Sequence, residues 1–106
     1  MITIGEFKKM ELRVGEIKEV QDHPAADRLY VLKVDMGDKI KQLVAGIKGS
    51  YSKEELLGKQ VVVIDNLESA FLRGVESQGM LLASSDDTGV AIITPERMMK
   101  LGSPVT

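Results

Sequence analysis

The stretch Leu12-Arg13-Val14-Gly15-Glu16-Ile17-Lys18-Glu19-Val20 contains the pattern that decides the fold. Its apolar side chains alternate with polar ones as far as Val14, and after Gly15 the apolar positions continue one step out of phase. A glycine at such a phase shift is typical of a β-bulge, and a bulge bends its strand sharply. We therefore expect a bent first strand with its bulge at Gly15.

The next part of the chain predicts a hairpin followed by a short helix. Residues 29–45 contain two strand-like segments joined by the tight turn Met36-Gly37-Asp38. Ser52, with Glu55 three residues later, has the pattern of a capping box, and Gly58 is suited to end the helix. The sequence thus predicts a helix of about two turns between the third and fourth strands.

The remaining segments predict further strands and short helical turns at both ends. Residues 60–64 are apolar and rich in β-branched side chains, which is typical of a buried strand. Residues 79–83 and 90–93 are expected to pair as a second hairpin. A helical turn is expected within residues 4–10, and Thr94-Pro95 predicts the start of a last short helix, because proline is tolerated at the first helical position.

The order strand, strand, strand, helix, strand, strand, with a bent first strand, indicates an all-β protein. It predicts a five-stranded Greek-key barrel, the OB-fold, with a short helix between strands 3 and 4. A chain of 106 residues fits one such domain. OB-folds commonly bind oligonucleotides on the face of strands 2 and 3. Residues 28–48 cover that face and are basic, with Arg28, Lys33, Lys39, Lys41 and Lys48 against two acidic residues.

The composition excludes several kinds of active site. The chain has no cysteine and one histidine, so neither a thiolate nucleophile nor a cysteine–histidine metal site is expected. That histidine, His23, precedes Pro24 in a polar stretch typical of a loop, and no phosphate-binding glycine motif is present. We therefore expect a protein that is not an enzyme and uses no cofactor or metal. No apolar run is long enough to span a membrane, which favours a cytoplasmic protein.

Aromatic residues are scarce, and this bears on the type of nucleic acid that the chain could bind. The four aromatic residues are Phe7, Tyr30, Tyr51 and Phe71. Proteins that bind single strands stack successive bases on aromatic side chains. Tyr30 fits a strand core position and Tyr51 the start of the helix, so at most Phe71 remains, which is too little for a base-stacking groove. The sequence therefore favours a structured RNA, recognised by its backbone and shape.

Residues 66–82, Asn66-Leu67-Glu68-Ser69-Ala70-Phe71-Leu72-Arg73-Gly74-Val75-Glu76-Ser77-Gln78-Gly79-Met80-Leu81-Leu82, resemble the tRNA-binding domain family. This family occurs at the C-terminus of many methionyl-tRNA synthetases and as free-standing dimeric tRNA-binding proteins. Further motifs of the family occur in order at residues 12–15, 23–29, 34–37 and 51–58. The resemblance implies an OB-fold that binds the outer corner of tRNA by shape. It also implies a homodimer joined through residues 85–106, with a methionyl-tRNA synthetase catalytic chain as a candidate partner.

Candidate tRNA-binding residues come from this resemblance and from the basic strand face. The family's Ser-x-x-Met motif corresponds to Ser77 and Met80. Its asparagine turn corresponds to Asn66, and Arg73 occupies the basic position before a glycine. Alternatively, Ser77 caps a turn, Met80 belongs to the core and Asn66 adopts a left-handed turn. The complete candidate set is Arg28, Lys33, Lys41, Lys48, Asn66, Arg73, Ser77, Gln78 and Met80.

The chain departs from the family pattern at Glu68-Ser69-Ala70-Phe71, where relatives often carry Lys-Pro and a further basic residue. Fewer phosphate contacts imply a modest tRNA affinity with a weaker salt dependence, or two subunits acting together. The alternative function is that of a CsaA-type secretion chaperone, a related fold that binds unfolded polypeptide. CsaA-type proteins resemble this chain less at residues 77–80, which follow the pattern of the tRNA-binding family.

Overall fold

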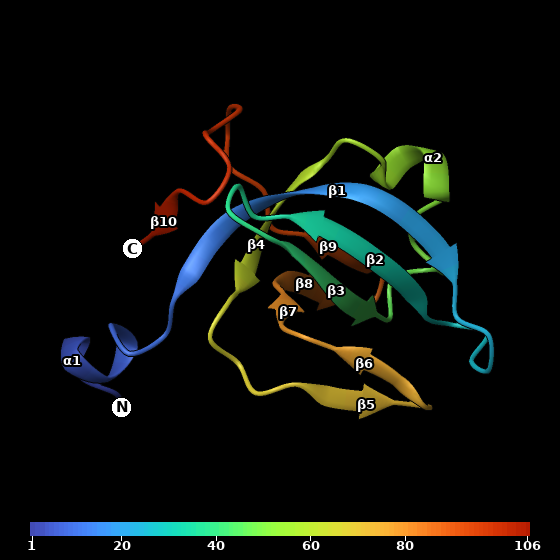
Figure 1. Cartoon of the computed structure of the whole chain (residues 1–106), viewed down its shortest axis with the longest axis horizontal. Coiled ribbons are helices and arrows are strands. Elements are labelled where there is room, and N and C mark those ends of the chain that lie inside the picture. Colours follow the sequence, from blue (N-terminus) through green and yellow to red (C-terminus); the bar gives the residue numbers. More distant parts are fainter.

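The computed structural model describes all 106 residues and shows antiparallel strands curved into a barrel (Figure 1). The elements in chain order are α1 (Ile4–Phe7), β1 (Leu12–Asp22), β2 (Tyr30–Asp35), β3 (Ile40–Ala45), α2 (Lys53–Leu56), β4 (Gln60–Ile64), β5 (Ala70–Leu72), β6 (Val75–Ser77), β7 (Met80–Leu81), β8 (Ala83–Asp86), β9 (Gly89–Ile92) and β10 (Pro104–Val105). Strands β3, β2, β1, β4 and β7 lie side by side in that order, and β10 pairs with the start of β1. The predicted all-β barrel of the OB type, with a helix between its third and fourth strands, is confirmed.

The two edges of this five-stranded sheet approach each other between β3 and the segment before β7. The Gln78 amide donates to the Gln42 carbonyl oxygen at 2.7 Å, and the Gln42 amide donates to Gln78 Oε1 at 2.8 Å. One step along β3, the Val44 amide donates to Ser77 Oγ at 3.0 Å. These bonds cover a strand edge that would otherwise be open to pairing with another chain.

Strand β1 is long and curved, as predicted, but its irregularity is not at Gly15. Its pairing with β2 shifts register between Ile17 and Glu19, so the prediction of a bulge at Gly15 was wrong. Gly15 instead allows close packing: a Cβ atom there would lie 2.6 Å from Val34 Cγ1 and 2.7 Å from the Met36 sulfur. The glycine is needed because the side chains of Val34 and Met36 leave no room for a side chain at this point.

The core fills the inside of the barrel with aliphatic side chains from its strands and from α2. Tyr30 belongs to it, as predicted, and its hydroxyl donates to the Tyr51 carbonyl oxygen at 2.8 Å. The buried cluster consists of Ile17, Tyr30, Leu32, Val34, Met36, Leu43, Ala45, Ile47, Leu56, Val61, Val63, Leu81 and Ile92. Because β1 to β4 all contribute to it, burial of these residues stabilises the whole barrel.

Helix α2 forms at the predicted place with the predicted capping box, but as one turn where about two were expected. The Ser52 hydroxyl accepts from the Glu55 amide at 3.2 Å, and the Glu55 carboxylate accepts from the Ser52 amide at 2.9 Å. Gly58 follows the helix with a φ of +85°, a conformation that glycine adopts without steric cost. The single turn is too short to be stable alone, and burial of Leu56 in the core holds it.

The C-terminal half differs from the sequence predictions in two ways. The hairpin pairs β8 with β9, while β7 joins β4 in the barrel, so the predicted pairing of 79–83 with 90–93 is shifted. The helix predicted after Thr94-Pro95 was wrong, because residues 94–100 form bends only. The Gln60 side chain explains the difference: it donates to the Met99 carbonyl oxygen at 2.7 Å and accepts from the Met99 amide at 2.9 Å.

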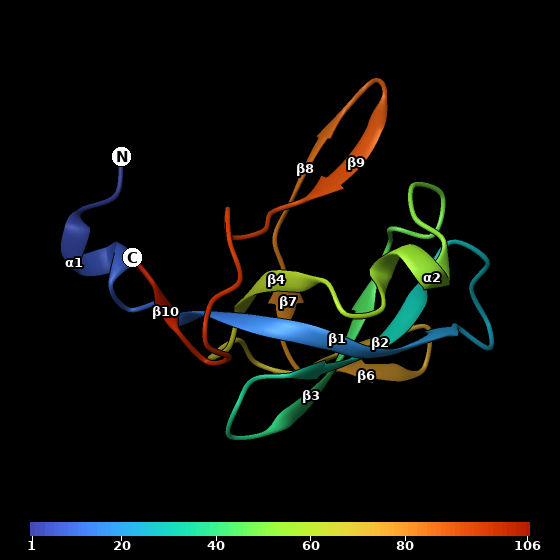
Figure 2. The same cartoon turned by 90° about the horizontal axis from the view of Figure 1, so that it is seen from above.

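The turned view shows where the outlying parts lie. The β8–β9 hairpin projects away from the barrel, while α1 and β10 lie together at another end (Figure 2). The hairpin β5–β6, which we did not predict, lies along the outside of β3 (Figure 1). Neither helix has the length and apolar character needed to cross a membrane.

Candidate nucleic-acid interface

The loop of residues 23–29 and the β5–β6 hairpin meet at one end of the barrel (Figure 1). His23 joins them: its Nε2 lies 2.8 Å from the Leu72 carbonyl oxygen, and its Nδ1 accepts from the Ala25 amide at 2.9 Å. Because Nδ1 accepts from a backbone amide, Nε2 is the ring nitrogen that donates to the Leu72 carbonyl oxygen. This buried histidine is therefore a structural link between two loops.

Arg73 and Gly74 form the tip of the β5–β6 hairpin. Both have positive φ angles, +51° and +89°, which is the geometry of a two-residue type I′ turn. The Arg73 guanidinium donates to the Ala25 carbonyl oxygen at 3.3 Å. It shares an open depression with Ala26, Asp27, Arg28 and the residues beside them in the loop. The hairpin tip and the loop thus form one surface.

Arg28 and Arg73 are the two cations of this surface. Both are exposed, and neither forms an ion pair with a carboxylate of the chain. Asp27 lies in the same depression and partly offsets their charge. A guanidinium with free donors suits bidentate contact with a phosphate group. The structure therefore brings together two of the nine candidate residues in a position to bind an anionic backbone.

The lysines of the β2–β3 face bond to other groups of the protein. Lys33 Nζ donates to Gln42 Oε1 at 2.7 Å, between neighbouring strands. Lys41 Nζ lies 2.7 Å from Asp65 Oδ1 and 3.0 Å from the Gln78 carbonyl oxygen, and only 15% of its side chain is exposed. The ammonium of Lys41 thus ties β3 to the end of β4 and has little capacity left for a ligand.

Asp65 is the centre of a network that sequence reasoning missed. Its buried carboxylate receives Arg13 Nη1 at 2.8 Å and Lys39 Nζ at 3.1 Å in addition to Lys41. Burial alone would raise the pKa of Asp65, but the hydrogen bonds from these three cations outweigh it and hold that pKa far below its ordinary value. Arg13 also reaches the Gly102 carbonyl oxygen at 3.2 Å, so the network fixes the C-terminal segment.

Three polar candidates make structural hydrogen bonds. Ser77 is buried. Its hydroxyl donates to the Gly79 carbonyl oxygen at 3.0 Å and accepts from the Val44 amide of β3. Gln78 joins the barrel edges as described above. Asn66 accepts from the Glu11 amide at 2.9 Å and donates to the Lys9 carbonyl oxygen at 2.7 Å, which holds the chain before β1.

Two further candidates remain at the surface and do not line the arginine depression. Lys48 forms an ion pair with Asp22 at 3.0 Å, and Lys53 shares the same carboxylate. Met80 has 48% of its surface exposed, so it does not belong to the core. Phe71 is far more exposed, at 71%, and was not in the candidate set.

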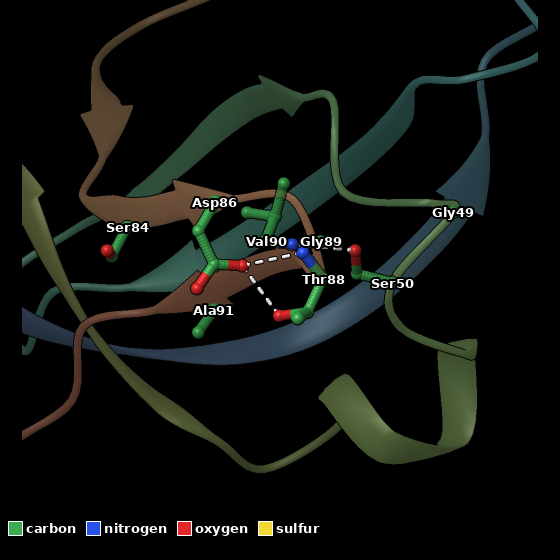
Figure 3. A pocket seen from close by; sticks show the side chains of 8 residues that line it. All are labelled: Gly49, Ser50, Ser84, Asp86, Thr88, Gly89, Val90 and Ala91. Carbon is green, nitrogen blue, oxygen red and sulfur yellow. Dashed lines mark hydrogen bonds between the residues drawn. The ribbon is translucent and has the colours of Figure 1, made fainter.

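A polar depression at the β8–β9 hairpin has the character of a turn (Figure 3). Asp86 Oδ1 accepts from the Thr88 amide at 2.8 Å and from its hydroxyl at 2.6 Å, and Ser50 Oγ accepts from the Val90 amide at 3.1 Å. These bonds satisfy the hairpin itself. The carboxylates of Asp86 and Asp87 would repel phosphate, so this depression is a poor place for RNA.

The fold and the surface together define a class: an OB-type barrel with exposed arginines where two of its loops meet. Residues 12–104 match the family model described as "Putative tRNA binding domain". The chain belongs to this family.

Three relatives illustrate the range of proteins that contain the domain. The methionine–tRNA ligase of Thermococcus kodakarensis is 59% identical over 104 residues, which cover 98% of this chain but 14% of that protein. The crystal structure of a MetRS related protein from Pyrococcus horikoshii is 32% identical with a TM-score of 0.92, covering 100% of this chain and 98% of that one. The CsaA chaperone protein of Picrophilus torridus has the same identity and TM-score, with 100% of both chains covered.

Proposed function

We propose that the chain binds folded tRNA and carries out no chemistry itself. The match of residues 12–104 to the tRNA-binding family carries this proposal. The unpaired guanidinium groups of Arg28 and Arg73 support it, because phosphate contacts supply most of the affinity of a protein for folded RNA. A cytoplasmic location belongs to the same proposal.

The candidate residues divide into two groups in this proposal. Arg28 and Arg73 contact phosphates directly, and Lys33 and Lys48 add to the positive potential that attracts the RNA. The remaining candidates act mainly by holding the surface in shape, through the bonds given above; they are Lys41, Asn66, Ser77 and Gln78. Met80 is exposed and available to an RNA that extends over β7.

A role beside a methionine–tRNA ligase follows from the relatives. The chain spans 14% of the length of the ligases that it matches, so it corresponds to one part of those enzymes. We propose that it raises the concentration of tRNA near a ligase catalytic unit, either within one polypeptide or as a separate subunit. Tethering two binding modules in this way strengthens binding without any new contact.

Dimerisation through residues 85–106 is the second part of the proposal. Ile93, Met98 and Met99 in this segment have 43%, 68% and 41% of their surfaces exposed. Apolar side chains gathered at a surface favour association with another protein. A dimer would present two arginine depressions to one tRNA or to two.

A filter-binding titration with bulk tRNA at low and moderate salt tests the function. The wild type should bind, and its affinity should fall as salt rises. The double variant Arg28→Ala/Arg73→Ala should bind more weakly. The slope of its log affinity against log salt concentration should be less steep by about two, one for each lost phosphate contact. Lys8→Ala/Lys9→Ala removes the same charge from exposed positions outside the depression and outside residues 85–106, and is the matched control. No binding by the wild type, or equal loss in both double variants, would contradict the proposal.

Polypeptide binding is the alternative function, and the full-length similarity to the CsaA chaperone protein favours it. The same titration distinguishes the two functions when an unfolded polypeptide replaces tRNA. Apolar contacts with a polypeptide would not weaken as salt rises, whereas phosphate contacts would. Salt-insensitive polypeptide binding without tRNA binding would establish the chaperone function.

A further inference from the structure

The β5–β6 hairpin presents one aromatic ring to solvent without a structural need for it. Phe71 has 71% of its surface exposed and belongs to neither hydrophobic cluster. All three residues of β5 are exposed, so the strand packs no side chain into the barrel. The ring is therefore free to contact a ligand, and its removal should not disturb the core.

The ring is carried by the same hairpin as one side of the arginine depression. Phe71 is two residues before Arg73, whose guanidinium reaches across to the loop that carries Arg28. On the neighbouring strand its cross-strand partner is Glu76. An exposed aromatic ring on the same hairpin as an arginine without an ion pair suits a nucleotide, because a base can stack on the ring while a neighbouring phosphate binds the guanidinium group.

The hairpin that carries the ring is held in place. The carbonyl oxygen of Leu72, the residue after Phe71, is bonded to buried His23. At the base of the hairpin, the Ser77 hydroxyl accepts from the Val44 amide of β3. The tight turn at Arg73 and Gly74 leaves no loose residues at the tip. A ring on such a fixed element loses little conformational freedom when a ligand binds.

We infer that Phe71 stacks on one unpaired base of the bound tRNA, while Arg28 and Arg73 hold the adjacent phosphate. This inference rests on the proposed function. One ring cannot form a groove for a single strand, but folded RNA exposes individual unstacked bases in its loops, and one ring is enough for one of them. The scarcity of aromatic residues is thus compatible with base contact.

Stacking can be observed directly with a tryptophan at this position. The chain contains no tryptophan, so Phe71→Trp creates a single tryptophan, whose emission lies at longer wavelength than that of the two tyrosines. Its emission should be quenched as bulk tRNA is added, in step with binding. Ile40→Trp is the matched control, because Ile40 is 55% exposed and lies at the far end of the β2–β3 hairpin (Figure 1). Equal quenching in both variants, or none at Phe71→Trp while tRNA is bound, would overturn the inference.

Affinity measurements separate stacking from simple apolar contact. Phe71→Ala should weaken tRNA binding about five- to 150-fold, without the change in salt slope that Arg73→Ala causes. Phe71→Leu keeps an apolar side chain but no aromatic face, so it should lose nearly as much, whereas Phe71→Tyr should bind like the wild type. Circular dichroism checks that each variant is folded. If the wild type binds no tRNA, the proposed function fails as well; if the wild type and Phe71→Ala bind equally, only this inference fails.

Discussion

Asp65 shows how much one residue contributes to the shape of this molecule. Its carboxylate lies between cations from β1, from the β2–β3 turn and from β3, and it is itself almost fully buried. Removing one member of a buried ion pair leaves the other charges without a partner, which costs far more than losing an exposed pair. The network therefore makes the position sensitive to loss of charge.

We predict that Asp65→Asn lowers the free energy of unfolding by about 3 kcal/mol, because Lys41 and Arg13 lose their common counter-ion. Urea denaturation at neutral pH measures this change. Asp38→Asn is the control: Asp38 also bonds Arg13, at 3.1 Å, but its side chain is 62% exposed, and stability should change little. A similar loss in both variants would show that Arg13 alone is responsible.

The same carboxylate predicts a dependence of stability on pH. The pKa of Asp65 is lowered in the folded state relative to its ordinary value of about 4, so its contribution is complete above about pH 4 and is lost as pH falls further. The free energy of unfolding should therefore fall steeply below about pH 4 in the wild type and less steeply in Asp65→Asn. Parallel pH profiles would contradict this assignment.

At the residue scale the candidate cations have different surroundings, which the sequence did not distinguish. Arg28 and Arg73 are exposed and form no ion pair, whereas Lys41 is bound to a carboxylate that is distant in sequence. No local pattern indicates that Asp65 would be buried beside β3. Ion pairs such as that of Lys41 with Asp65 depend on tertiary contacts, and the spacing of residues along one strand does not indicate these contacts.

At the scale of elements, β1 packs closely against the end of β2 at Gly15. We predict that Gly15→Ala lowers the free energy of unfolding by about 1–3 kcal/mol, because the new methyl group would overlap Val34 and Met36. Gly49→Ala is the matched control, since nothing lies within 4 Å of a Cβ atom there. Thermal unfolding of both variants measures the difference, and equal melting temperatures would contradict close packing at Gly15.

Elements held by local signals were predicted correctly, and those held by distant contacts were not. The capping box at Ser52 and Glu55 is a local signal that marks where α2 begins. By contrast, the segment after Pro95 has a helix-like start but is held in another conformation by the side chain of Gln60. The β5–β6 hairpin was missed because its apolar residues are exposed, so it lacks the alternation of a half-buried strand.

At the scale of the whole molecule, the barrel and its family were predictable because many weak signals agree along the chain. The place of the proposed interface was not, because it lies where the loop after β1 meets a hairpin whose Leu72 carbonyl oxygen bonds His23. A histidine before a proline in a polar stretch gives no sign of such a partner. Only the folded chain brings the two segments together.

The oligomeric state is the property of the whole molecule that is most open to test. Deleting residues 85–106 would be a poor test, because Ile92 lies in the core and Arg13 bonds the Gly102 carbonyl oxygen, so the barrel itself would be destabilised. Met98→Asp changes one exposed side chain in that segment and leaves these contacts in place. It is therefore a cleaner probe of the proposed dimer.

We predict that sedimentation analysis finds a dimer for the wild type and a monomer for Met98→Asp, because a charge buried in an apolar interface is strongly unfavourable. Ile40→Asp places the same charge on an exposed apolar position outside residues 85–106 and should remain dimeric. If Met98→Asp stays dimeric, the interface lies elsewhere. The tRNA affinity of the monomer then tests whether both depressions of a dimer bind the same RNA. Weaker binding by the monomer, with the same salt dependence for each subunit, would show that they do, because linked sites gain affinity that separate sites lack.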